Sequence, residues 1–72
     1  MKKISEIKLE KDRILVLIDS GGYFEDRDDN VAILENLNFK VISINGNLIK
    51  AEKENGNLFS QTLKELEQSG FY

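Results

Sequence analysis

The residues of this chain with the clearest potential for chemistry are the acids that follow its most apolar segment. Asp19 ends the run RILVLID, and Asp26 and Asp28 come shortly after it. Carboxylates gathered behind a strand can hold Mg²⁺ for phosphoryl transfer, because this ion takes oxygen ligands and neutralises phosphate charge. A Mg-dependent phosphoryl-transfer or nucleotide-binding domain that uses these acids is therefore one hypothesis for function.

The same acids also match the beginning of a calcium-binding loop in part. Asp26, Asp28 and Asn30 have the spacing of the alternate oxygen ligands in an EF-hand. However, the position that requires glycine is Val31, and the position of the closing bidentate acid is Leu37. Such a loop could neither turn sharply nor complete the coordination sphere, so we expect no calcium site. The leading hypothesis given below uses no metal and no cofactor.

The intervening loop, Asp19-Ser20-Gly21-Gly22, has two further interpretations. DSGG surrounds the nucleophile of serine proteases, but the chain has no histidine to act as the base. Glycines before a helix can also cradle a phosphate, although acids follow at once here and no P-loop lysine, serine or threonine is present. Turn chemistry with Gly21 or Gly22 at positive φ is the simplest explanation. The ligand-binding candidates of the alternative hypothesis are Asp19, Ser20, Gly21 and Gly22.

Two aromatic residues next to the acids indicate a surface that binds another protein. Aromatic anchors ringed by charge are typical of interface hot spots. Residues 14–35 hold six acids and one arginine, a net charge of −5, although the whole chain carries only −3. A segment of this sign fits a basic patch on a partner protein. The partner-binding candidates are Tyr23, Phe24, Glu25, Asp26, Asp28 and Asp29.

A structural role competes with this binding role. Asp26 or Asp28 could be the N-cap of a helix, and the neighbouring acids would then face free amides and the positive end of the helix dipole. An aromatic residue in the position of Phe24 is more often a core residue at the entrance of a helix. The sequence leaves both interpretations open.

Composition excludes several kinds of chemistry. The chain has no cysteine and no histidine, so it lacks disulfides, a zinc site of the usual kind and the commonest general base and thiol nucleophile. Its 72 residues must supply a core and leave few to build a pocket that excludes water. The chain has no basic stripe with interleaved aromatic residues, so we expect no direct binding of nucleic acid.

The sequence also favours a cytoplasmic protein. The N-terminal residues alternate in charge and do not form a signal peptide. The longest apolar stretch, Ile14 to Ile18, is far shorter than a membrane span.

Because a core of this size seldom supplies more than roughly 3–5 kcal/mol, we expect a homodimer. The leading hypothesis is a non-enzymatic acidic module that acts as an inhibitor, adaptor or regulator of a partner protein, without contacting a membrane.

The spacing of apolar residues predicts one α+β domain over residues 1–72, in the order ββαββα. About four strands would form a sheet with two helices packed on one face. A parallel βαβ crossover over Arg13 to Ile44 is the alternative. The predicted strands are Ile4 to Leu9, Arg13 to Asp19, Lys40 to Ile44 and Leu48 to Lys53. The first predicted helix begins between Asp26 and Asp29 and ends around Asn38, and the second runs from Ser60 to Ser69.

Several local details can also be predicted. Arg13 to Asp19 is apolar on both faces, which predicts a central strand covered on two sides. Asn45-Gly46 should form a hairpin turn, and Asn55-Gly56-Asn57 should break the chain before the second helix. Gly70 and Phe71 fit a Schellman motif in which Phe71 contacts Leu66. The predicted core is Ile14, Val16, Leu17, Ile18, Leu34, Leu37, Ile42, Ile44, Leu63 and Leu66.

Overall fold

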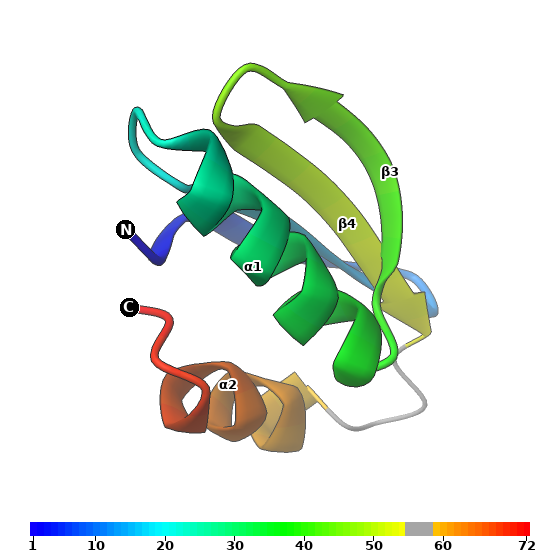
Figure 1. The fold of residues 1–72 in the computed structure, drawn as a ribbon. Helices are drawn as coiled ribbons and strands as arrows, with labels where there is room; N and C mark the ends of the chain where they lie inside the picture. Colours follow the sequence, from blue (N-terminus) through cyan, green and yellow to red (C-terminus); the bar gives the residue numbers. More distant parts are fainter. Residues whose placement is uncertain (55–58) are drawn as a thin grey trace.

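The computed structural model describes residues 1–54 and 59–72 of the chain (Figure 1). It confirms the α+β class and the order ββαββα. The predicted break at residues 55–57 lies outside the described residues. The elements are β1 (Lys3–Glu10), β2 (Arg13–Asp19), α1 (Phe24–Asn36), β3 (Lys40–Asn45), β4 (Leu48–Glu54) and α2 (Phe59–Gln68).

The four strands form one antiparallel sheet in the order β1-β2-β4-β3. β1 is an edge strand and β2 is central, as predicted. β2 and β3 point in the same direction, but β4 lies between them and pairs with both. The α1 crossover therefore joins two parallel strands that are not neighbours, and the second hairpin inserts β4 into the space.

Both helices cover the same face of the sheet, as predicted (Figure 1). β2 contributes alternate residues to the core, where they meet side chains from β4, from both helices and from the segments that follow the helices. This alternation is what a sheet with one covered face requires. The buried apolar residues are Ile14, Val16, Ile18, Leu34, Phe39, Ile49, Ala51, Leu66 and Phe71.

The expectation that β2 is covered on two sides is wrong. Leu15 and Leu17 lie on the face opposite the helices and are only half-buried. Each has one lysine and one glutamate as cross-strand neighbours: Leu15 lies between Lys8 and Glu52, and Leu17 lies between Glu6 and Lys50. The long stems of lysines can shield apolar surface while the ammonium groups stay in water. An antiparallel sheet needs only one covered face, so the apolar residues on both faces of β2 did not imply a second layer.

The prediction that two residues of β3 belong to the core is also wrong. Ile42 and Ile44 are each 46% exposed. β3 lies at the edge of the sheet, and its register shifts at a bulge between Val41 and Ser43. Val41 consequently packs against the core. Ile33 of α1 and Leu37, the C-cap of this helix, also pack there. A bulge changes the alternation of side chains, which sequence spacing alone does not indicate.

The two hairpins turn through residues with positive φ. Lys11 and Asp12 connect β1 to β2, and Lys11 has φ 47°. Asn45 pairs with Leu48, so Gly46 and Asn47 form the second turn. Gly46, at φ 62°, occupies the first central position, where a type II′ turn requires glycine. This turn lies one residue later than the predicted Asn45-Gly46.

The end of α2 confirms the predicted Schellman motif. Gly70 has φ 95°, and its N–H donates to the carbonyl of Glu67. The N–H of Phe71 donates to the carbonyl of Leu66 at 3.0 Å. Phe71 and Leu66 are both buried, so the motif satisfies the last carbonyls and places an aromatic ring in the core.

α1 ends in the same way, with asparagine in place of glycine. Asn38 has φ 69°, a conformation that asparagine adopts more readily than most residues. The N–H of Phe39 donates to the carbonyl of Leu34 at 2.9 Å, and both residues are buried. The motif therefore ends α1 and leads directly into β3.

Candidate functional site

The acids around residue 26 lie in the first two turns of α1. The helix begins at Phe24, earlier than predicted, and Tyr23 is its N-cap without a side-chain cap hydrogen bond. Neither Asp26 nor Asp28 caps the helix, so that prediction is wrong. Glu25 and Asp26 are in the first turn, where the helix dipole stabilises negative charge. Asp28 lies in the second turn, beyond most of this effect, so capping and dipole explain only part of the cluster.

Tyr23 and Phe24 are exposed at the start of α1. Tyr23 is 74% exposed and Phe24 is 66% exposed, so the alternative that Phe24 is a core residue is wrong. The guanidinium carbon of Arg27 lies 4.7 Å from the centroid of the Phe24 ring. Arg27 also donates to the carbonyl of Gly46 in the β3–β4 turn at 3.4 Å. Arg27 thus contacts one face of the Phe24 ring through a cation–π interaction. The same side chain connects α1 to the β3–β4 turn.

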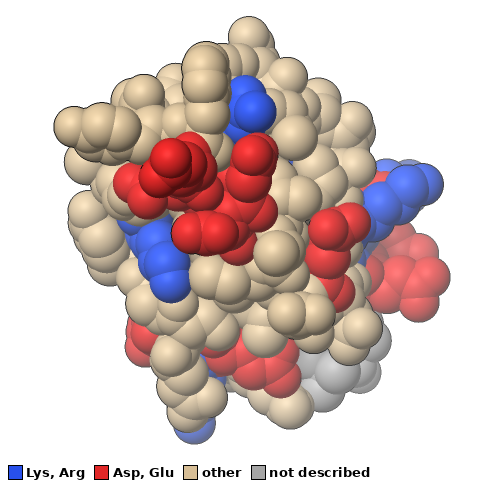
Figure 2. Space-filling model, viewed as in Figure 1, with Lys and Arg blue, Asp and Glu red and all other residues tan. Residues whose placement is uncertain are grey.

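The carboxylates differ in whether they are already paired. Asp26 lies 2.9 Å from the N-terminal ammonium group of Met1, and Asp28 lies 3.4 Å from Arg27. Glu25 and Asp29 form no ion pair with any described residue. Figure 2 shows acidic side chains gathered on the face that carries the start of α1 in Figure 1. We call Tyr23, Phe24, Glu25, Asp26, Asp28 and Asp29 the acidic aromatic patch.

The side chain of Asp19 stabilises the loop between β2 and α1. Its Oδ1 accepts hydrogen bonds from the N–H of Gly21 at 2.9 Å and from Nδ2 of Asn47 at 2.8 Å. The first bond closes the loop between β2 and α1, and the second joins this loop to the β3–β4 turn. Gly21 supplies the positive φ of the loop at 76°, which is the turn role that the sequence predicted.

Ser20 and Asn30 form a buried polar contact beneath the same loop. Nδ2 of Asn30 donates to Oγ of Ser20 at 2.8 Å and to the carbonyl of Met1 at 2.9 Å. Both side chains are buried. A Cβ on Gly21 would lie 3.2 Å from Cβ of Met1. The protein itself therefore fills the space around Ser20 and Gly21, whereas Gly22 is exposed and a Cβ there would meet nothing within 4 Å in the described part of the chain.

The acids of the magnesium hypothesis are directed to three different partners. Asp19 accepts from Asn47, Asp26 meets the N-terminal ammonium group and Asp28 meets Arg27. Within residues 1–54 and 59–72, no three acidic side chains are grouped so that they could hold a metal ion. The structure therefore does not bring the proposed ligands together.

We expect millimolar MgCl₂ or CaCl₂ to leave the thermal midpoint of unfolding unchanged. A folded-state site filled at a hundred times its Kd would add about 2.7 kcal/mol of stability. In a domain of this size, that corresponds to a rise of roughly 10 °C or more. The measurement is a circular-dichroism melt, with NaCl at equal ionic strength as the control. A rise of several degrees with the divalent salt alone would contradict this expectation.

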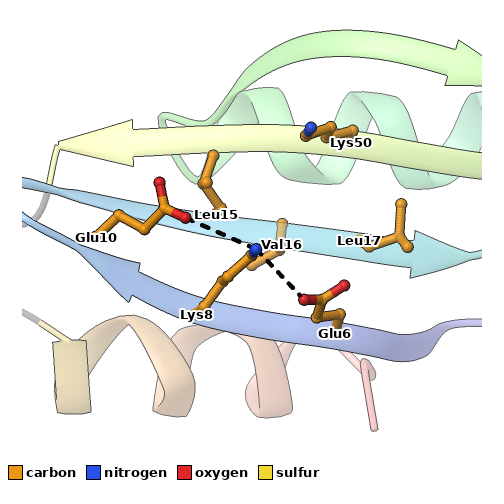
Figure 3. Close-up of a pocket in the computed structure, with 7 residues that line it drawn as sticks. All are labelled: Glu6, Lys8, Glu10, Leu15, Val16, Leu17 and Lys50. Atoms are coloured by element: carbon orange, nitrogen blue, oxygen red, sulfur yellow. Dashed lines mark ion pairs between the residues drawn. The ribbon is translucent and has the colours of Figure 1, made fainter.

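The acidic aromatic patch is a surface and not a pocket. A hollow of about 390 Å³ lies on the sheet face opposite the helices (Figure 3). Leu15 and Leu17 contribute to its lining, and Lys8 lies 3.6 Å from Glu6 and 3.7 Å from Glu10 along its side. None of the patch residues line this hollow. The patch can therefore contact another macromolecule but does not enclose a small substrate.

Comparisons with known proteins provide no relative for this chain. No protein-family model matches it, and neither the curated proteins nor the solved structures contain a significant match. Neither helix in the described part of the chain has the length and apolar character needed to cross a membrane.

Sequence reasoning grouped the patch residues on one short segment but missed the contacts that support their positions. The stacking of Arg27 on Phe24 and the burial of Asn30 were not predicted. A signal for Asn30 was present, because it lies four residues before Leu34 and seven before Leu37 on the apolar side of α1. A polar residue on the apolar side of a helix is buried together with its apolar neighbours, so it must find hydrogen-bond partners inside the protein.

Proposed function

We propose that this chain is a small non-enzymatic protein-binding module that inhibits, adapts or regulates a partner protein. The acidic aromatic patch would contact a basic surface of that partner. The main support is the exposure of Tyr23 and Phe24, at 74% and 66%, beside the carboxylates of Glu25 and Asp29. Two neighbouring aromatic rings on a surface are typical of a binding anchor.

The geometry of the patch supports binding through a rigid surface. Phe24 is in the first turn of α1, and Arg27 contacts both its ring and the β3–β4 turn. Little ordering would then be required on association, which favours affinity. Glu25 and Asp29 remain for lysines or arginines of the partner, which would accelerate association and select a basic surface.

We also propose that the module acts as a homodimer. Only nine apolar side chains of the described residues are buried. A core of this size contributes a small net stability, and neither a disulfide nor a zinc site can supplement it. Association with a second copy would bury additional apolar surface.

Affinity capture from a lysate of the source organism, followed by titration of the purified partner, tests the binding proposal. Glu25→Gln/Asp29→Asn removes two charges from the patch. Its matched control is Glu35→Gln/Glu67→Gln, which makes the same change in net charge at exposed acids that form no ion pair within residues 1–54 and 59–72. Tyr23→Ala/Phe24→Ala removes the aromatic anchors, and Tyr72→Ala controls for the loss of an exposed ring elsewhere.

The aromatic variant should weaken binding about 30-fold or more, because hot-spot side chains contribute about 2 kcal/mol or more each. The patch charge variant should weaken it less, and its effect should shrink as salt is raised. Both controls should bind like the wild type. Equal losses in the patch charge variant and its control would show that only net charge matters, and retained binding in both patch variants would place the interface elsewhere.

A further inference from the structure

One face of the sheet is covered by neither helix of the described chain, because both helices pack on the other face (Figure 1). We call it the open face. Leu15 and Leu17 of β2 lie at its centre and are half-buried, and the hollow of about 390 Å³ is beside them (Figure 3). An apolar centre with charged residues around it is the usual layout of a protein–protein interface.

The charges on the open face balance, although the chain as a whole is acidic. Directly opposed residues of paired strands point to the same side of a sheet, so the register of β2 with its neighbours identifies the members of this face. Its charged members are five cations and five acids: Lys3, Glu6, Lys8 and Glu10 on β1, Arg13 and Asp19 on β2, Lys40 on β3, and Lys50, Glu52 and Glu54 on β4. The net charge of −3 therefore comes from other parts of the chain. Two copies can bring their open faces together without the repulsion between two acidic surfaces.

We infer that the open face packs against the open face of a second copy, so that the two sheets form a sandwich. This rests on the homodimer of the proposed function and assigns its interface, and it does not depend on the acidic aromatic patch. Such a contact is isologous, so the face must complement itself about a two-fold axis. We place the axis across the strands, over the row of cross-strand partners Ile7, Val16, Ala51 and Val41.

Rotation about this axis brings opposite charges together on both sides of β2. On β1, Glu6 of each copy lies opposite Lys8 of the other, because these residues flank the central row. On β4, Lys50 of each copy lies opposite Glu52 of the other for the same reason. Each pair occurs twice by symmetry, so four pairs of opposite charge surround the centre of the contact.

The outer rows of the open face follow the same pattern. The bulge in β1 places Lys3 in one row with Asp19, and Glu10 shares the opposite row with Arg13. Lys3 of each copy then lies opposite Glu10 of the other, and Asp19 lies opposite Arg13. Packed sheets are rotated by about 30°, so these outer pairs are less closely aligned than the inner ones. The remaining charges, Lys40 and Glu54, lie opposite the uncharged Ser43 and Leu48. No like charges meet among the described residues of this face, and this complementarity favours a second copy as the occupant.

The two leucines provide the apolar centre of the contact. Leu15 of each copy lies opposite Leu17 of the other, because they flank Val16. Sheets that pack face to face are about 10 Å apart, which allows leucines of the two sheets to touch. Four strands span only about 20 Å, which is small for a specific interface. We therefore expect association in the micromolar range or weaker.

Sedimentation equilibrium from micromolar to millimolar protein tests this interface with two charge-reversed variants. Lys8→Glu/Lys50→Glu makes the inner rows of the open face acidic, and Glu6→Lys/Glu52→Lys makes them basic. Like charges then meet in a homodimer of either variant, but opposite charges meet when the two variants are mixed. Each variant alone should remain at the monomer mass, whereas the wild type and the equimolar mixture should approach twice the 8.3 kDa of one chain. Circular dichroism must show that each variant folds.

Matched controls make the same changes of net charge outside the open face. Lys11→Glu/Lys64→Glu and Glu35→Lys/Glu67→Lys alter exposed residues that form no ion pair within residues 1–54 and 59–72. Both controls should dimerise like the wild type. A second readout needs no variant, because the wild-type dimer should weaken between about 0.05 M and about 0.5 M NaCl as salt screens the charge pairs.

Four results would overturn this assignment. A wild-type mass equal to one chain at millimolar protein, with a cooperative melt, would remove the homodimer as well as its interface. A dimer that persists in either charge-reversed variant, or that is insensitive to salt, would retain the homodimer but reject the open face. Equal dissociation of the controls would show that only net charge matters. A mixture of the two variants that stays at the monomer mass would reject the pairing of opposite charges. Binding of the acidic aromatic patch to its partner is measured separately, so each of these results leaves that proposal unaffected.

Discussion

Phe71→Ala is expected to remove most of the stability of the fold, although Phe71 is the last residue but one of this sequence. Its ring is buried in the core cluster with Leu66, and Nζ of Lys2 lies 5.8 Å from the ring centroid. Truncation of a buried phenylalanine costs about 3–5 kcal/mol. A domain of this size has a net stability of roughly the same magnitude. A large fraction of the variant should therefore be unfolded at room temperature.

Urea unfolding followed by circular dichroism measures the effect, and Tyr72→Ala is the matched control. The side chain of Tyr72 is 69% exposed. Its backbone exchanges hydrogen bonds with the start of the chain, where its N–H donates to Lys2 and its carbonyl accepts from Ile4. Those bonds survive the substitution, so the control should change stability by less than about 0.5 kcal/mol. Similar losses in the two variants would mean that chain-end contacts, and not the ring in the core, provide the stability.

The features that sequence reasoning predicted correctly depend on residues close together in the chain. Gly70, Phe71 and Leu66 form a motif within six residues, because only the local backbone decides whether the last carbonyls of a helix are satisfied. The common face of Ile14 and Val16, both buried as predicted, follows from the two-residue period of a strand. The fold class and the element order follow from many such local patterns.

The features that were predicted wrongly depend on which strands become neighbours. Ile42 and Ile44 have the composition of a buried strand, yet insertion of β4 beside β2 leaves β3 at the edge. The bulge between Val41 and Ser43 then changes which side chain contacts the core. Neither event has a local signal, because strand order results from competition between long-range pairings.

The candidate site shows the same division. Tyr23 and Phe24 stand next to the acids in the sequence, so their proximity could be predicted. The exposure of Phe24 could not, since it depends on the residue at which α1 begins. The contact of Arg27 with Gly46 crosses from helix to hairpin, and it exists only because α1 begins beside the β3–β4 turn.

Asn30→Asp is expected to cost about 3–5 kcal/mol at neutral pH, because it buries a charge while the neighbouring ammonium group of Met1 is already paired with Asp26. Nδ2 of Asn30 donates to the carbonyl of Met1 and to Ser20, whereas Oδ1 has no hydrogen-bond partner among the described residues. A carboxylate has no proton to donate to the Met1 carbonyl, so two oxygens would face each other at the present donor–acceptor distance of 2.9 Å. The loss should be evident as a lower urea midpoint at pH 7.

Acidification should restore part of this loss, and the sign of the effect identifies its cause. Burial raises the pKa of a carboxyl group above its unfolded value. The folded variant therefore binds the proton more tightly, and its stability rises as pH falls through the folded pKa. Asn36→Asp, at an exposed position near the end of the same helix, should cost less than about 1 kcal/mol. A loss in Asn30→Asp that stayed constant from neutral to acid pH would indicate altered shape and not a buried charge, and would contradict the assignment of Asn30 as a buried donor beneath the β2–α1 loop.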